Sequence, residues 1–145
     1  MKFAFDAQMD TVSLSEAGVE LTIKTVDRKA DLTIAGKPVT LRVLGPDSTM
    51  YRAQLDANAR RAAADVEAKN KNPDAPDRDR SEDTLDFLAA LTVGWSDHIT
   101  DIAGKPVPFS TENARAMYKA YPDIRDQVDV FVARRTNFLR VSSKG

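Results

Sequence analysis

The sequence contains no cysteine and a single histidine, His98. Disulfides, thiolate metal ligands and cysteine nucleophiles are therefore excluded, as is every metal motif that needs two histidines. The six glycines are scattered, and neither the G-x-G-x-x-G nor the G-x-x-x-x-G-K-[ST] phosphate-binding pattern occurs. Enzymes that use NAD or ATP in the usual ways are thus disfavoured, and we expect no cofactor and no metal.

Long apolar runs are also missing, since none approaches the ~20 residues that cross a bilayer. The first ten residues lack the apolar region of a signal peptide, so we expect a cytosolic protein without membrane contact. The 21 Lys and Arg residues nearly balance the 22 Asp and Glu residues. A net charge of −1 gives no overall attraction to nucleic acid. The 145 residues, 42% of them hydrophobic, are typical of a single globular domain covering 1–145.

Residues 1–46 are predicted to be rich in β structure. Apolar and polar residues alternate there with a period of two, which places the apolar set on one face of a half-buried strand. We expect a small antiparallel sheet of about three strands, which needs helices to cover its apolar face. The alternating apolar residues are Phe3 and Phe5, then Val19, Leu21 and Ile23, then Val39, Leu41 and Val43.

Residues 47–145 are predicted to be helical, because the apolar period changes to 3.6 after Gly45-Pro46. Asp47 or Ser48 is expected to cap the first helix. Trp95 falls on the apolar stripe of the second helix and is expected in the core. The fold class is therefore α+β, a small antiparallel N-terminal sheet packed with about four helices, which we expect near 48–70, 82–94, 111–121 and 123–140.

Residues 71–80 are predicted to form a mobile acidic loop, because they hold two prolines, dense charge and no large apolar side chain. Their acids do not match a calcium-binding loop, which needs a glycine at its centre and a closing glutamate. His98 has Asp97 and Asp101 nearby, as a catalytic base would. No serine lies in a nucleophile-elbow context, so we favour a surface histidine and a protein that is not an enzyme.

Two groups of side chains are candidates for binding a partner protein. Trp95, Phe109, Tyr118 and Tyr121 gather around a connector, either as core residues or as interface anchors, for which Trp and Tyr are favoured. The second group is basic and consists of Arg134, Arg135, Arg140 and Lys144, with no acid after Asp129. These side chains either complement the dipole at a helix C-terminus or form a docking surface for an acidic partner.

Five segments occur in a distinctive order and spacing between residues 44 and 139: LGPDS followed by YR at 44–52, LTVGW at 91–95, PFSTENA at 108–114, YPDIRDQV at 121–128 and NFL at 137–139. In these segments the chain resembles the tail assembly chaperones of long-tailed, non-contractile bacteriophages (the siphophage type). The resemblance implies a non-catalytic protein that binds the tape measure protein, and the tail tube protein, during virion morphogenesis. It also implies action in the host cytoplasm and absence from the mature virion.

Two other classes of function remain open from the sequence. The first is a structural tail or neck component, such as a terminator, connector or tube protein, which would stay in the virion. The second is a small enzyme, which would need a convergent polar pocket with perturbed titratable groups. The residues offer little from which to build such a pocket.

Overall fold

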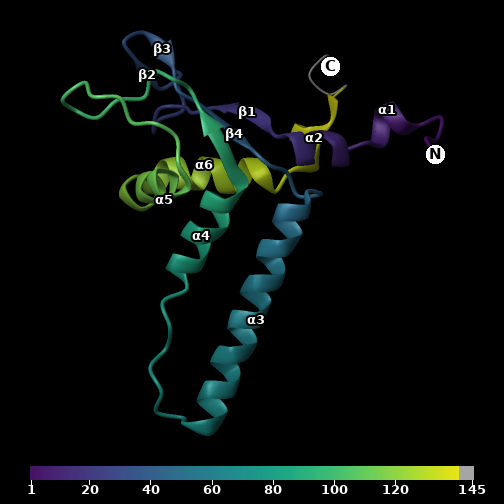
Figure 1. Cartoon of the computed structure of the whole chain (residues 1–145), viewed down its shortest axis with the longest axis vertical. Coiled ribbons are helices and arrows are strands. Elements are labelled where there is room, and N and C mark those ends of the chain that lie inside the picture. The colour runs from purple at the N-terminus through teal and green to yellow at the C-terminus, as the bar shows by residue number, and fades with distance from the viewer. Residues whose placement is uncertain (141–145) are drawn as a thin grey trace.

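The structure is a computed structural model that describes residues 1–140, and its fold class is α+β, as predicted (Figure 1). Within these residues, the helices accompany a three-stranded antiparallel sheet and a separate two-stranded hairpin. The elements are α1 (Asp6–Met9), α2 (Val12–Ala17), β1 (Val19–Thr22), β2 (Thr33–Ile34), β3 (Lys37–Pro38), β4 (Thr40–Val43), α3 (Thr49–Lys71), α4 (Ser81–Leu91), β5 (Thr92–Trp95), α5 (Thr111–Ala120), α6 (Pro122–Val132) and a 3-10 turn (Arg135–Phe138).

The main sheet has the strand order β1-β4-β5, so β4 is its centre. Leu41 of β4 lies opposite Leu21 of β1 on one side and opposite Trp95 of β5 on the other. β1 and β4 confirm two of the predicted strands. Their inward side chains belong to the same buried cluster as those of α4, and α4 packs against α5 and α6. The largest fully buried side chains are Tyr118, Phe138, Ile23, Leu41, Leu88 and Leu91.

The strand predicted around Phe3 and Phe5 is wrong, because the segment that follows folds into α1 and α2. Asp10 explains part of the difference. Its carboxylate accepts hydrogen bonds from the backbone N–H groups of Val12 and Ser13, each at 3.0 Å, and from the Ser13 hydroxyl at 2.6 Å. Such local side-chain bonds compete with strand pairing and satisfy the first donors of a helix. Two alternating phenylalanines are too short a pattern to outweigh them.

The second predicted helix is shorter than expected, and the residues that were predicted to form its end are instead the third strand of the sheet. We expected a helix over 82–94, but α4 ends at Leu91 and β5 follows at once. Thr92 and Val93 are β-branched and Gly94 is a weak helix former, so this segment favours a strand over a helix. It pairs with the edge of β4 that β1 leaves uncovered. Trp95 therefore belongs to a strand and not to the helical stripe.

The last predicted helix is also shorter than expected. We expected a helix over 123–140, but α6 ends at Val132 and a separate 3-10 turn follows at Arg135–Phe138. Phe138 in that turn is fully buried, and its ring packs edge-on against Phe131 with centroids 5.6 Å apart. Burial of this aromatic ring explains why the chain turns back towards the core and does not continue as a straight helix.

The predicted helix over 48–70 is confirmed as α3, and Ser48 is its N-cap. The Ser48 hydroxyl accepts a hydrogen bond from the backbone N–H of Tyr51 at 3.1 Å. At 1.5 Å per residue, its 23 residues span about 35 Å, and the helix projects away from the body (Figure 1). Its expected apolar stripe is largely uncovered, because Leu55 is 50% exposed and Val66 is 58% exposed.

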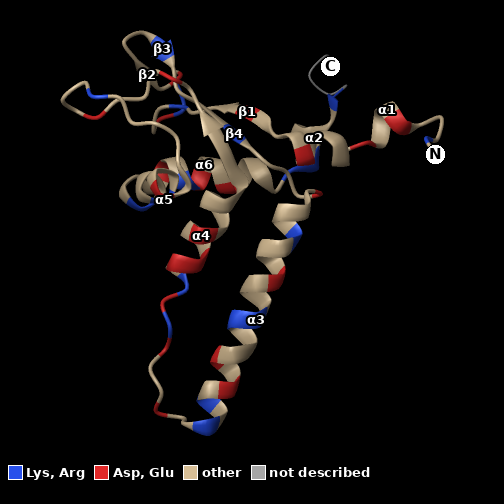
Figure 2. Ribbon diagram, in the orientation of Figure 1, with Lys and Arg blue, Asp and Glu red and all other residues tan. Residues whose placement is uncertain are grey.

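Near its start, α3 packs on α4 through the Tyr51 and Phe87 rings, whose centroids are 5.0 Å apart. Further along, polar side chains join α3 to the loop and to α4. Figure 2 shows charges of both signs along the end of α3 and the returning loop. The Arg78 guanidinium binds Asp65 of α3 at 2.9 Å and Asp83 of α4 at 2.8 Å. These bonds join the end of the 71–80 loop to α3 and α4, and Lys69 of α3 also binds the Ala75 carbonyl oxygen and Asp77 earlier in the loop. The mobility of the loop stays a prediction.

Replacing Arg78 with glutamine should speed trypsin cleavage of the loop at Lys71 and Arg80 several-fold, because local opening governs access to such sites. Cleavage of parent and variant would be followed by mass spectrometry. Arg60→Gln, at an exposed position of α3, is the matched control and should leave the rate unchanged. Equal rates in parent and Arg78→Gln would show that Arg78 does not restrain the loop.

Candidate partner-binding groove

An open groove of about 780 Å³ lies between the β2–β3 hairpin, the connector after β5, α5 and the start of α6. Its walls are mainly apolar side chains from segments that are far apart in the sequence. They include Leu32, Val39, Trp95, Ile99, Met117 and Ile124. This is the size of a ligand or peptide site, and it is open along one side.

Trp95 forms part of the wall and is held in place by the connector. Its indole Nε1–H donates a hydrogen bond to the carbonyl oxygen of Val107 at 3.1 Å. The Phe109 ring packs edge-on against it, with the ring centroids 5.4 Å apart. Because the polar atom of Trp95 is already satisfied, the part of the ring that faces the groove acts as an apolar contact surface.

The rim of the groove near α6 is polar. The Gln127 amide accepts a hydrogen bond from the Lys24 N–H and donates one to the Lys24 carbonyl oxygen, each at 2.9 Å. Arg28 donates two hydrogen bonds to Asp123, at 2.7 and 3.0 Å, and this contact holds the pKa of the Asp123 carboxyl below its ordinary value. Tyr121 stands at the same rim and is 60% exposed.

The predicted aromatic candidates thus divide into two sets. Trp95 and Tyr121 line the groove, and Phe109 supports Trp95. Tyr118 is fully buried in the core, where its hydroxyl lies 2.6 Å from the Thr92 hydroxyl oxygen. Thr92 in turn donates to the Leu88 carbonyl oxygen at 2.8 Å, so Tyr118 is the donor to Thr92. Tyr118 is therefore a core residue and not part of the accessible surface.

Tyr118→Phe should lower the free energy of unfolding by about 1 kcal/mol, because it removes one buried hydrogen bond. Burial raises the pKa of Tyr118 to about 12 from an ordinary value near 10. The stability that depends on its neutral form is present below pH 10 and is lost as the pH rises towards 12. Urea unfolding at pH 7, 10 and 11.5 would measure both effects.

Tyr121→Phe, at an exposed position, is the matched control and should leave the stability at pH 7 unchanged. If Tyr118→Phe loses as much stability as the parent between pH 10 and 11.5, the buried hydroxyl is not the titrating group.

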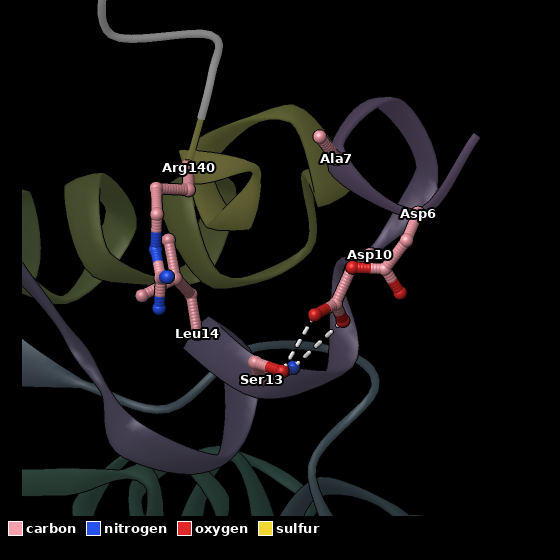
Figure 3. A pocket seen from close by; sticks show the side chains of 6 residues that line it. All are labelled: Asp6, Ala7, Asp10, Ser13, Leu14 and Arg140. Atoms are coloured by element: carbon pink, nitrogen blue, oxygen red, sulfur yellow. Dashed lines mark hydrogen bonds between the residues drawn. The ribbon is translucent and has the colours of Figure 1, made fainter. Parts of the chain in front are cut away.

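The members of the predicted basic group that lie in the described residues have different surroundings. Arg135 donates two hydrogen bonds to Asp47, at 2.9 and 3.0 Å, and so joins the 3-10 turn to the start of α3. Figure 3 shows Arg140 beside Leu14, in a small cavity whose other wall carries Asp6 and Asp10. Arg134 is exposed. Lys144 lies outside the described residues.

Asp47→Asn should lower the free energy of unfolding at pH 7 by about 1 kcal/mol, because its bonds with Arg135 and Thr11 weaken. These hydrogen bonds hold the pKa of the Asp47 carboxyl below its ordinary value. Its contribution is therefore complete above about pH 4 and is lost as the pH falls through the lowered pKa. Denaturant unfolding from pH 7 to pH 2 should show the difference between parent and variant shrinking, whereas Asp56→Asn, at an exposed position of α3, should match the parent at pH 7. A difference that is independent of pH would contradict this role.

His98, the candidate catalytic base, has a structural contact. His98 Nε2 lies 3.1 Å from the Lys37 carbonyl oxygen and so connects the end of β5 to the hairpin. Within residues 1–140, His, Asp and Glu side chains form no group of three that could hold a metal ion. No helix in this described part is long and apolar enough to cross a membrane.

Sequence reasoning identified the aromatic part of the groove but missed most of its walls. Met117 and Ile124 fall within the helices predicted over 111–121 and 123–140, and Leu32 falls within the β-rich region, but no local feature marks these three residues as part of a site. One feature of the sequence could have indicated the groove: in α5, Ala116 and Ala120 extend the apolar surface beyond the stripe that faces the core.

Comparison of the chain with protein-family models, with curated proteins and with solved structures gave no match.

Proposed function

We propose that this protein is a tail assembly chaperone of a long-tailed, non-contractile bacteriophage. In this proposal it binds the tape measure protein, and also the tail tube protein, in the host cytoplasm, and leaves before the virion is complete. It performs no catalysis. The observation that carries the proposal is the open apolar groove between the hairpin and α5, taken together with the resemblance of residues 44–139.

The groove suits an apolar helical segment of a long partner. A helix that docks in a groove inserts side chains at positions i, i+3 or i+4 and i+7. Met117 and Trp95 offer soft and aromatic contact surface, which accommodates different side chains along a long partner. The tape measure protein of this chaperone family is long and helical, so covering its apolar stripes would keep it from aggregating.

The shape of the groove also suits release of the tape measure protein from the chaperone. It is open along one side, and ion pairs such as Arg28–Asp123 lie at its rim. Contacts in such a site are numerous and individually weak. They can be broken one after another, more readily than the contacts in one deep pocket. A growing tail tube can therefore displace the chaperone step by step.

The proposal is tested by mixing the purified chain with fragments of the tape measure protein encoded by the same phage. We expect a complex by size-exclusion chromatography and reduced light scattering from the fragments. Mass spectrometry of purified virions should detect none of this chain. Absence of a complex at any salt concentration, or stoichiometric recovery of the chain in virions, would instead favour a structural tail component.

A further inference from the structure

The segment between β1 and β2 forms one wall of the groove, and we call residues 24–31 the rim turn. Lys24, Thr25 and Val26 line the groove, and every residue of the rim turn except the half-buried Thr25 is exposed. No buried apolar side chain of the rim turn therefore fixes it to the body. Segments with few buried apolar contacts open locally at a free energy well below that of unfolding the whole domain.

Polar side chains of α6 hold the rim turn in place. The Gln127 amide bonds both the backbone N–H and the carbonyl oxygen of Lys24, each at 2.9 Å, as a neighbouring strand would. Arg28 donates two hydrogen bonds to Asp123, at 2.7 and 3.0 Å, and Gln127 donates a third to the same carboxylate at 3.1 Å. The start of α6 thus binds the rim turn at two points.

The backbone of Arg28 is strained in this arrangement. Its φ is 65°, in the left-handed region that an arginine rarely adopts. Its guanidinium also donates to the carbonyl oxygens of Thr25 and Val26, each at 3.1 Å, so one side chain ties the strained turn together and joins it to α6. Release of the contact with Asp123 lets the backbone relax, and this relief offsets part of the free energy of the lost bonds.

We propose that the rim turn is a latch of the groove, closed by Asp123 and Gln127 and opened by local release of the turn. Because Lys24, Thr25 and Val26 belong to the groove wall, opening widens the groove beside α6. A helical segment then enters or leaves sideways, and closure of the latch holds it. In this role, which rests on the proposed function, the rate at which the rim turn opens controls how fast the tape measure protein is bound and released.

Amide hydrogen exchange of the free protein tests the latch without any partner. The backbone N–H of Thr25 donates to the Ala30 carbonyl oxygen at 2.9 Å across the rim turn, so its exchange reports opening. Asparagine accepts the left-handed backbone but is too short to bind Asp123 as arginine does. In Arg28→Asn this exchange should therefore be about fivefold faster. Lys29→Asn is the matched control, because it removes the same charge from the next position, and it should leave the exchange unchanged.

The rates of partner binding test whether the latch controls the groove. Trp95 is the only tryptophan of the chain and lines the groove, so its fluorescence in stopped-flow mixing follows binding of a tryptophan-free tape measure fragment. A gate through which the partner both enters and leaves should make association and dissociation of Arg28→Asn about fivefold faster, with little change in affinity. Loss of an ordinary contact chiefly raises the dissociation rate. Arg28→Asn/Asp123→Asn should behave as Arg28→Asn alone, because the two side chains act through one contact.

Exchange that is equal in the parent, Arg28→Asn and Lys29→Asn would overturn the latch. So would an Arg28→Asn variant in which only dissociation is faster, or a double variant that adds a second effect of similar size. A parent that forms no complex with the fragment, while exchange in the rim turn still responds to Arg28→Asn, would contradict the proposed function and support the opening of the turn.

Discussion

Gly45→Ala should lower the free energy of unfolding by about 3 kcal/mol, at the upper end of the cost of overpacking a core. A Cβ atom at this position would lie 2.4 Å from the Ser15 hydroxyl oxygen and 2.7 Å from two atoms of the Phe138 ring. Ser15 and Phe138 are both fully buried, so neither has room to move away. Three distant parts of the chain meet here, namely α2, the β4–α3 junction and the 3-10 turn.

Gly94→Ala is the matched control, because the nearest atom to its added Cβ is 4.0 Å away, in the Arg42 side chain. Since glycine in a strand is less favourable than alanine by about 0.5–1 kcal/mol, this variant should be as stable as the parent or slightly more stable. Urea unfolding of the three proteins measures the difference. Equal stability of both variants would show that the Gly45 junction is not closely packed.

Ala116→Arg should weaken binding to tape measure fragments about a hundredfold, or about 2.7 kcal/mol. Ala116 lies on α5, is exposed and lines the groove, so the longer side chain does not disturb the core. It does fill the groove, and any apolar partner that still bound there would have to desolvate a guanidinium. Isothermal titration of the folded variant with a tape measure fragment measures the loss.

Ala64→Arg introduces the same side chain on α3, away from the groove, and should bind as tightly as the parent. The comparison separates blocking of the groove from a general effect of added positive charge. Unchanged affinity in Ala116→Arg would place the binding surface elsewhere on the molecule.

Local signals in the sequence predicted those elements that depend on local chemistry. Ser48 and Ser110 accept hydrogen bonds from the first turns of α3 and α5, and the helices predicted over 48–70 and 111–121 begin beside them. β5 was missed because the apolar run from Leu91 to Trp95 fits a helix as well as a strand. Pairing with the uncovered edge of β4 favours the strand over the helix, and this pairing depends on the tertiary structure.

The groove was only partly predictable, because its walls come from segments that are far apart in the sequence. Trp95 and Tyr121 were found because aromatic residues gather near the connector, whereas Leu32 has no local feature that sets it apart. Tyr118 and Tyr121 are three residues apart, and both fall in the helix predicted over 111–121. α5 ends at Ala120, so Tyr118 enters the core and Tyr121 reaches the rim. Arg135 likewise appeared unpaired because its partner Asp47 is 88 residues away.

The chaperone proposal is tested most directly by co-expressing the tape measure protein with this chain and measuring the soluble fraction. We expect the tape measure protein to be soluble with the parent chain and with Ala64→Arg, and to aggregate alone or with Ala116→Arg. A tape measure protein that is equally soluble with the parent chain, with Ala116→Arg and with no chaperone at all would contradict the proposal.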